Sequence, residues 1–162
     1  KDYMQLLNVN SYQKGGWVLH MLRRKLGDEL FWQGIKKYYA AYAGKNASTD
    51  DFRKVMEATS GKDLQVFFKQ WLYTPGLPLL DVKWKYNEIR RTVTITAEQT
   101  QTPLFDISLQ VALESGTEII LQNMNIKDKT NQLELPCAKK PSKLMLDPGV
   151  NVLFDARIRE TD

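Results

Sequence analysis

The sequence predicts an α+β fold in two parts, an all-α helical bundle over residues 1–76 followed by a β-sandwich over residues 77–162. Before residue 74, apolar residues recur at the three- and four-residue spacing of a helix face. The segment from Thr74 to Pro78 holds two prolines and a glycine, which cannot continue a helix. After it, apolar and polar residues alternate with the period of a strand.

The first helix is expected over residues 12–26, and Gly27 is a natural C-terminal stop. Its inward face is expected to carry Trp17, Val18, Met21, Leu22 and Leu26. Asp28 is expected to cap a second helix that ends before Gly44. The inward residues of this second helix are expected to be Leu30, Phe31, Ile35, Tyr38, Tyr39 and Tyr42.

A third helix is expected to follow residues 47–51, because hydroxyl groups there can cap backbone donors and the acids suit the positive end of a helix dipole. It places Phe52, Val55 and Met56 inward and ends at Gly61. A fourth helix is expected over residues 63–73. The aromatic residues of the four helices are expected in a packed core rather than a ligand box: Trp17, Phe31, Trp32, Tyr38, Tyr39, Phe67, Phe68 and Trp71.

The second part is expected to contain about seven short strands separated by turn signals, which is typical of an immunoglobulin-like β-sandwich. The expected runs are 80–86, 93–95, 105–113, Glu118 to Ile126, Gln132 to Leu135, Lys143 to Leu146 and Val150 to Phe154.

Composition excludes several classes of protein. The 162 residues carry a formal charge of +4, but basic and acidic residues are interleaved, so no nucleic-acid partner is expected. No run of about eighteen apolar residues predicts a membrane span, and no signal peptide is evident. A single cysteine, Cys137, allows no intrachain disulfide and is expected to be a structural thiol. The first residue is Lys1 rather than methionine, which suggests a processed product or a fragment.

Tyr12 is the candidate catalytic residue. The order Tyr12-x-Lys14-Gly15-Gly16 places a phenol and an ammonium together at the expected start of the first helix. A tyrosine there can aim its hydroxyl into a cleft and steady an oxyanion, or it can simply pack or cap. Lys14 and the two glycines are expected to be structural, with the glycines permitting close approach of another helix.

The sequence lacks the residues that other kinds of catalytic or binding site require. The only histidine, His20, has no second histidine four residues away, so it is expected to be half-buried rather than a zinc ligand. Serine and cysteine triads fail because Cys137 and His20 lie in different halves of the chain. No glycine-rich phosphate-binding motif occurs.

The order and spacing of many residues nevertheless resemble one family, the zinc-dependent aminopeptidases of the alanyl-aminopeptidase and leukotriene-hydrolase type (gluzincins). The resemblance covers residues 9–80 closely and the strand-rich remainder more loosely. The matching residues are Tyr12-x-Lys14-Gly15-Gly16, Val18 to Arg23, Leu26-Gly27-Asp28, Phe31, Gly34, Tyr38, Thr49-x-Asp51-Phe52, Met56-Glu57, Ser60 to Leu64, Phe67-Phe68, Trp71 and Gly76-Leu77-Pro78.

The resemblance implies that residues 1–76 are the second half of a thermolysin-like peptidase domain whose Tyr12 hydrogen-bonds the oxyanion of the tetrahedral intermediate. It also implies peptide substrates and a zinc ion in the parent enzyme, held by a His-Glu-x-x-His helix and a further glutamate. Those ligands, and the Gly-x-Met-Glu-Asn segment that binds the substrate amine, are missing here. The fragment alone is therefore expected to bind no zinc and to be inactive, with an exposed helical face that could form a homodimer.

Two other functions stay open. The parent could have lost its zinc site and serve as a non-catalytic binding or scaffold protein of the same fold. A basic helical bundle that binds nucleic acid would show affinity that falls steeply with salt, and this is not expected. The preferred N-terminal residue of the substrate and the cellular compartment are not predicted.

Overall fold

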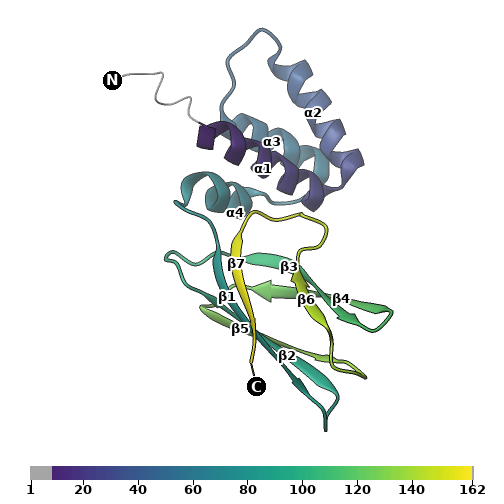
Figure 1. The fold of residues 1–162 in the computed structure, drawn as a ribbon. Coiled ribbons are helices and arrows are strands. Elements are labelled where there is room, and N and C mark those ends of the chain that lie inside the picture. Colours follow the sequence, from purple (N-terminus) through teal and green to yellow (C-terminus); the bar gives the residue numbers. More distant parts are fainter. Residues whose placement is uncertain (1–8, 162) are drawn as a thin grey trace. The chain divides into compact units, whose positions relative to one another are not determined.

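The computed structural model describes residues 9–161 and shows a mixed α+β fold (Figure 1). The chain divides into two compact units, and the division falls between Pro75 and Gly76. The helices all belong to the first unit and the strands to the second. Each unit has its own buried apolar residues.

The helical unit contains four α-helices and one π-helical turn among its described residues. They are α1 (Val9–Leu26), α2 (Asp28–Tyr42), α3 (Thr49–Ser60), α4 (Gln65–Phe68) and the π-helical turn η2 (Lys69–Tyr73). None of the helices found within residues 9–161 combines the length and the apolar composition that crossing a membrane requires.

The connection between α1 and α2 differs from the expectation at Asp28. The N-cap of α2 is Gly27, with φ of 85° and no side-chain capping bond, so the prediction that Asp28 caps this helix was wrong. Asp28 is the first helical residue, and its carboxylate instead accepts hydrogen bonds from Arg23 at 2.9 and 2.7 Å. Glycine adopts positive φ without steric cost, which allows the chain to turn here within one residue.

The predicted cap of α3 is confirmed. The hydroxyl of Ser48 accepts a hydrogen bond from the backbone N–H of Asp51 at 3.2 Å, and the Asp51 carboxylate accepts one from the backbone N–H of Ser48 at 2.9 Å. This is a reciprocal capping box. The backbone and hydroxyl hydrogen bonds from Ser48 lower the pKa of Asp51 below its usual value. Gly61 ends the helix in the left-handed conformation, also as expected.

The fourth helix is shorter than the sequence suggested. Residues 63–73 were expected to form one α-helix, but only Gln65–Phe68 is α-helical and Lys69–Tyr73 forms the wider π-helical turn. A π-helical turn rotates less per residue than an α-helix, so the residues within and after it point in other directions than α-helical spacing predicts. Leu72 is accordingly exposed, while Trp71 is buried.

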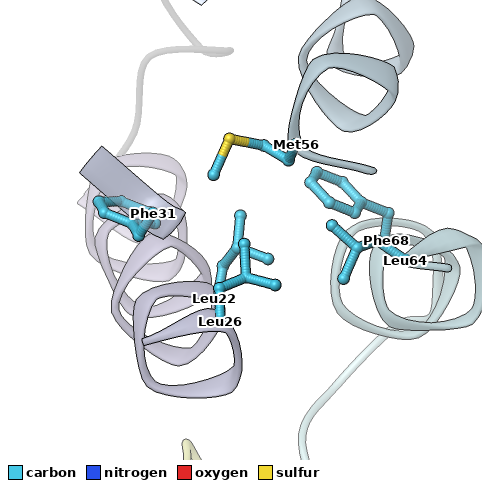
Figure 2. Packing of buried hydrophobic residues seen from close by; sticks show 6 residues of the cluster. All are labelled: Leu22, Leu26, Phe31, Met56, Leu64 and Phe68. Carbon is cyan, nitrogen blue, oxygen red and sulfur yellow. The ribbon is translucent and has the colours of Figure 1, made fainter. Parts of the chain in front are cut away.

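The core of the helical unit brings all four helices together. Figure 2 shows six buried side chains that face one another: Leu22 and Leu26 of α1, Phe31 of α2, Met56 of α3, Leu64 at the start of α4 and Phe68 within it. Burial of a large apolar side chain contributes roughly 1.5–3 kcal/mol. This cluster therefore holds the helices in their arrangement.

The aromatic prediction was correct for only part of its set. Phe31, Phe68 and Trp71 are buried, as expected of core residues. Trp32 and Tyr39 are 49% and 74% exposed, so their placement in the core was wrong. Their neighbours on α2 explain this, because the buried Phe31 and Gly34 define its inward face.

The strand unit contains seven strands among the described residues, arranged in two sheets. One sheet has the order β5-β2-β1-β7 and the other the order β4-β3-β6. β1 and β7 are parallel, and the other pairs are antiparallel. The strands are β1 (Leu79–Asn87), β2 (Thr92–Gln99), β3 (Ile107–Ser115), β4 (Glu118–Ile126), β5 (Thr130–Pro136), β6 (Lys143–Leu146) and β7 (Asp155–Glu160).

Alternating side chains of the strands build the core of this unit. On β2, Val93, Ile95 and Ala97 are fully buried while the residues between them are not. Gln99 continues this buried row, and its amide is satisfied by the backbone of Phe105, to which it donates at 2.8 Å and from which it accepts at 2.9 Å. The polar side chain thereby anchors the connection between β2 and β3.

The last strand lies later in the chain than predicted. Residues 150–154 were expected to form a strand, but the strand is β7 at Asp155–Glu160. The buried carboxylate of Asp147 accepts hydrogen bonds from the backbone N–H groups of Asn151 and Val152 at 2.6 and 2.8 Å. These donors are therefore not available to a sheet, and residues 150–154 form a loop.

Candidate active site

Tyr12 lies inside a helix rather than at its start. α1 is already helical at Val9, and Tyr12 is 69% exposed. Two turns further on, Val18, Leu22 and Leu26 of the same helix are buried in the helical unit. The phenol therefore projects from a helix whose later turns are held by the core, and its hydroxyl can donate one hydrogen bond to a group outside the chain.

Lys14 does not join Tyr12 in one site. Residues two apart in an α-helix do not face each other, because each residue turns the helix by about 100°. Since both residues belong to α1, the phenol and the ammonium point to different sides. The expectation that they stand together at a helix start was wrong because the helix already includes both.

Gly15 and Gly16 show no close helix approach within the described chain. A Cβ atom added at either position would meet no atom within 4 Å. The close approach occurs instead at Gly34 of α2, where a Cβ would overlap the thioether of Met56 on α3. The surface beside Gly15 and Gly16 is thus open to groups from outside this chain.

A line of exposed residues runs along α1. Tyr12, Gly16 and Leu19 are exposed and follow the i, i+4, i+7 spacing of one helix face. Sequence reasoning had not grouped Leu19 with Tyr12. The helical spacing between these residues was the signal that could have found this face.

The end of this face is fixed by a charged contact. The guanidinium of Arg23 pairs with Asp28 and also lies over the ring of Trp32, with its central carbon 5.6 Å from the ring centroid. The hydrogen bond to Asp28 raises the pKa of Arg23 above its usual value and lowers that of Asp28. The contact links the last turn of α1 to the first turns of α2.

His20 is half-buried, as predicted, and its ring packs edge-on against Trp17 with centroids 5.6 Å apart. Cys137 is buried in the strand unit, where its thiol donates a hydrogen bond to the carbonyl of Lys139 at 2.9 Å. Within residues 9–161, no three His, Cys, Asp or Glu side chains gather where they could hold a metal ion. Tyr12 therefore stays the candidate catalytic group. In the part of the chain that the structure describes, no set of metal ligands accompanies it.

The helical part of the chain matches a known family of peptidases. Residues 1–71 match the family described as the peptidase family M1 domain. The match includes Tyr12 and the helices α1 to α4.

Individual relatives are aminopeptidases. The chain is 34% identical to aminopeptidase N of Haemophilus influenzae over 71% of its own length, and 37% identical to aminopeptidase N of Escherichia coli over 57%. These matches span only 14% and 10% of the two relatives. The fold matches the crystal structure of Legionella pneumophila aminopeptidase A in complex with aspartic acid, with a TM-score of 0.79 and 17% identity. That match covers 97% of this chain and 19% of the other.

Proposed function

We propose that this chain is part of a zinc metallo-aminopeptidase that removes N-terminal residues from peptides, and that Tyr12 stabilises the oxyanion formed at the scissile carbonyl. The observation that carries the proposal is the family match over residues 1–71, which includes Tyr12. Two bacterial relatives are aminopeptidase N enzymes, which supports the same activity.

The geometry of Tyr12 suits this role. A catalytic hydrogen-bond donor must be held in place before the charge develops, so that no reorganisation is needed during the reaction. The exposed phenol of Tyr12 stands on α1, which is anchored through the buried residues Leu22 and Leu26. Its hydroxyl would donate to the oxyanion, and such a donor is worth about 10²–10³ in kcat.

The residues that the structure describes do not fit a zinc site. The described part lacks a cluster of metal-ligating side chains, and the ring of His20 packs against Trp17. The zinc ligands and the general base are proposed to belong to other segments of the parent enzyme, as the family resemblance implies. We therefore expect the 162-residue chain by itself to be inactive as a peptidase.

The two units receive separate assignments. Residues 1–76, which include the helical unit, are proposed to be the second half of a thermolysin-like peptidase domain. Residues 77–162 are proposed to form an immunoglobulin-like β-sandwich domain. The two sheets and their mainly antiparallel pairing support the second assignment.

The test compares the parent enzyme with its Tyr12→Phe variant in the hydrolysis of aminoacyl anilides at saturating zinc. We expect kcat to fall by about 10²–10³, because the phenol is lost while the ring remains. Zinc content, measured by metal analysis, should be unchanged. Tyr39→Phe is the matched control, since Tyr39 is a tyrosine of similar exposure on α2 of the same unit.

The outcomes separate the possible roles. Equal kcat for the wild type and the Tyr12→Phe variant would assign Tyr12 to packing rather than catalysis. If the parent shows no hydrolysis at all, the protein would instead be a binding or scaffold member of the family. Activity of the 162-residue chain alone would contradict the assignment of the metal ligands to other segments.

A further inference from the structure

The sheet edges of the strand unit are not equally protected. Exposed edge strands pair readily with other chains unless charges, proline or short length prevent it. β7 alternates charges along its whole length, β6 has only four residues, and β5 carries Glu134 and ends at Pro136. These three edges of the described sheets have the usual protection.

The fourth edge, β4, lacks it. This strand has nine residues, Glu118–Ile126, with one charge at its first position and no proline. Ile119 and Leu121 are 61% and 53% exposed on the same face, although both are large apolar residues. A long edge strand with exposed apolar side chains and a single charge predicts association.

The exposed apolar residues continue a row across the sheet. In the register of the three strands, Leu121 lies opposite Ala112 of β3, and Ala112 lies opposite Met145 of β6. Ala112 is fully buried, and its two partners in this row lie on either side of it. The row therefore ends in the exposed Leu121, at the unpaired side of β4.

The first five residues of β4 are complementary to themselves. When the segment Glu118-Ile119-Ile120-Leu121-Gln122 is paired with an antiparallel copy centred on Ile120, isoleucine 119 faces Leu121 of the second copy. Glu118 then faces Gln122 of the second copy, so that each carboxylate meets a side-chain amide that can donate to it. No like charges oppose each other, and directly opposed residues share one face of the sheet.

We propose that β4 is a homodimerisation edge, which pairs with β4 of a second copy of this chain about a two-fold axis at Ile120. The pairing would join two three-stranded sheets into one of six strands. A two-fold axis uses the same patch on both copies, which the self-complementary segment provides. The proposal does not depend on the peptidase function.

The test uses the 162-residue chain in sedimentation velocity over a hundredfold range of concentration. The wild type should shift from monomer to dimer, and Leu121→Lys should weaken the dimer by about tenfold or more because it places charge beside the axis. Ile89→Lys is the matched control, since Ile89 is 96% exposed in the turn between β1 and β2. Circular dichroism would establish that the variants are folded.

The register has its own test. Under mild oxidation, Ile120→Cys should form a reducible covalent dimer, because residues opposite each other across an antiparallel pair lie close together. Gln122→Cys should not, because its two copies would be separated by roughly 13 Å along the strands. A monomeric wild type at every concentration would overturn the proposal. So would a dimer unaffected by Leu121→Lys, which would instead place the contact on the exposed helical face expected from the sequence.

Discussion

At the scale of single residues, helical glycines in this chain have different surroundings. Gly34 faces Met56 so closely that a β-carbon would overlap the thioether, whereas Gly15 and Gly16 face open space. All three are in helices, where glycine is disfavoured relative to alanine by roughly 0.5–1 kcal/mol. Of these three helical glycines, only Gly34 lies where a neighbouring side chain leaves no room for a β-carbon.

Gly34→Ala is expected to lower the free energy of unfolding by about 1–2 kcal/mol, because Met56 is fully buried and must move within a packed core. Gly16→Ala should instead raise it by roughly 0.5–1 kcal/mol through helix propensity. Urea denaturation of the 162-residue chain, followed by circular dichroism, measures both.

Met56→Ala provides the control, since it removes the thioether that an alanine at position 34 would meet. The loss caused by Gly34→Ala should become smaller in that background. An equal loss in both backgrounds would show that the contact with Met56 is not the cause.

The aromatic residues of α2 differ in burial in a way that the sequence did not predict. Helical spacing alone could not separate the buried Phe31 from the exposed Trp32 and Tyr39, because all three are large and apolar enough for a core. The side on which α3 packs decided the matter, through the close contact of Gly34 with Met56. A sequence pattern does not contain that direction when several faces of a helix are apolar.

At the scale of elements, the loop before β7 depends on one acid. Asp147 is 5% exposed and has a positive φ of 47°. Its carboxylate binds the backbone N–H groups of Asn151 and Val152 and the side-chain amide of Asn151. This set of hydrogen bonds forms the turn that delivers the chain to β7.

Asp147→Ala is expected to destabilise the strand unit by about 1–3 kcal/mol, because it leaves partly buried backbone donors without an acceptor. Asp128→Ala, at an exposed turn position, should change the stability by less than about 0.5 kcal/mol. Thermal unfolding monitored by circular dichroism gives the comparison. A similar melting temperature for both variants would contradict the role of the Asp147 carboxylate.

The end of the helical unit shows a different limit of prediction. The apolar spacing of residues 63–73 correctly indicated a helical segment, and Phe68 and Trp71 are buried as expected. The π-helical turn was not predictable from the sequence. Its i to i+5 hydrogen bonding changes which side chains face inward, and no proline or glycine marks its position.

At the scale of the whole molecule, the two units differ in their cores. Among its described residues, the helical unit buries nine apolar side chains, six of them in the cluster of Figure 2, and several large apolar residues of α1 and α2 are exposed. The strand unit has longer rows of fully buried residues, such as Val93, Ile95 and Ala97 on β2. A smaller core gives less hydrophobic stabilisation.

We therefore expect the helical unit to open first under native conditions. Hydrogen exchange followed by mass spectrometry should show faster exchange in peptides from α2 and α3 than in those from β2 and β3. Gly34→Ala should increase exchange in α2 and α3 while leaving the strand peptides unchanged. Equal exchange of all four elements would instead show that the chain unfolds as one cooperative unit.

The sequence alone determined the order of helices and strands, the capping of α3 by a hydroxyl group of residues 47–51, the end of that helix at Gly61 and the family that the helical part resembles. These features depend on local chemistry and on spacing within a few turns of chain, which the sequence contains directly. Tyr12 as a catalytic donor came from the resemblance, and it stays a proposal.

Only the tertiary structure decided which faces and edges remain exposed. It placed Tyr39 in solvent, Met56 against Gly34, and the last strand after the Asp147 loop. It also left β4 at the edge of its sheet with Leu121 exposed. These outcomes depend on which elements pack together over long separations in the chain, and no local pattern specifies that choice.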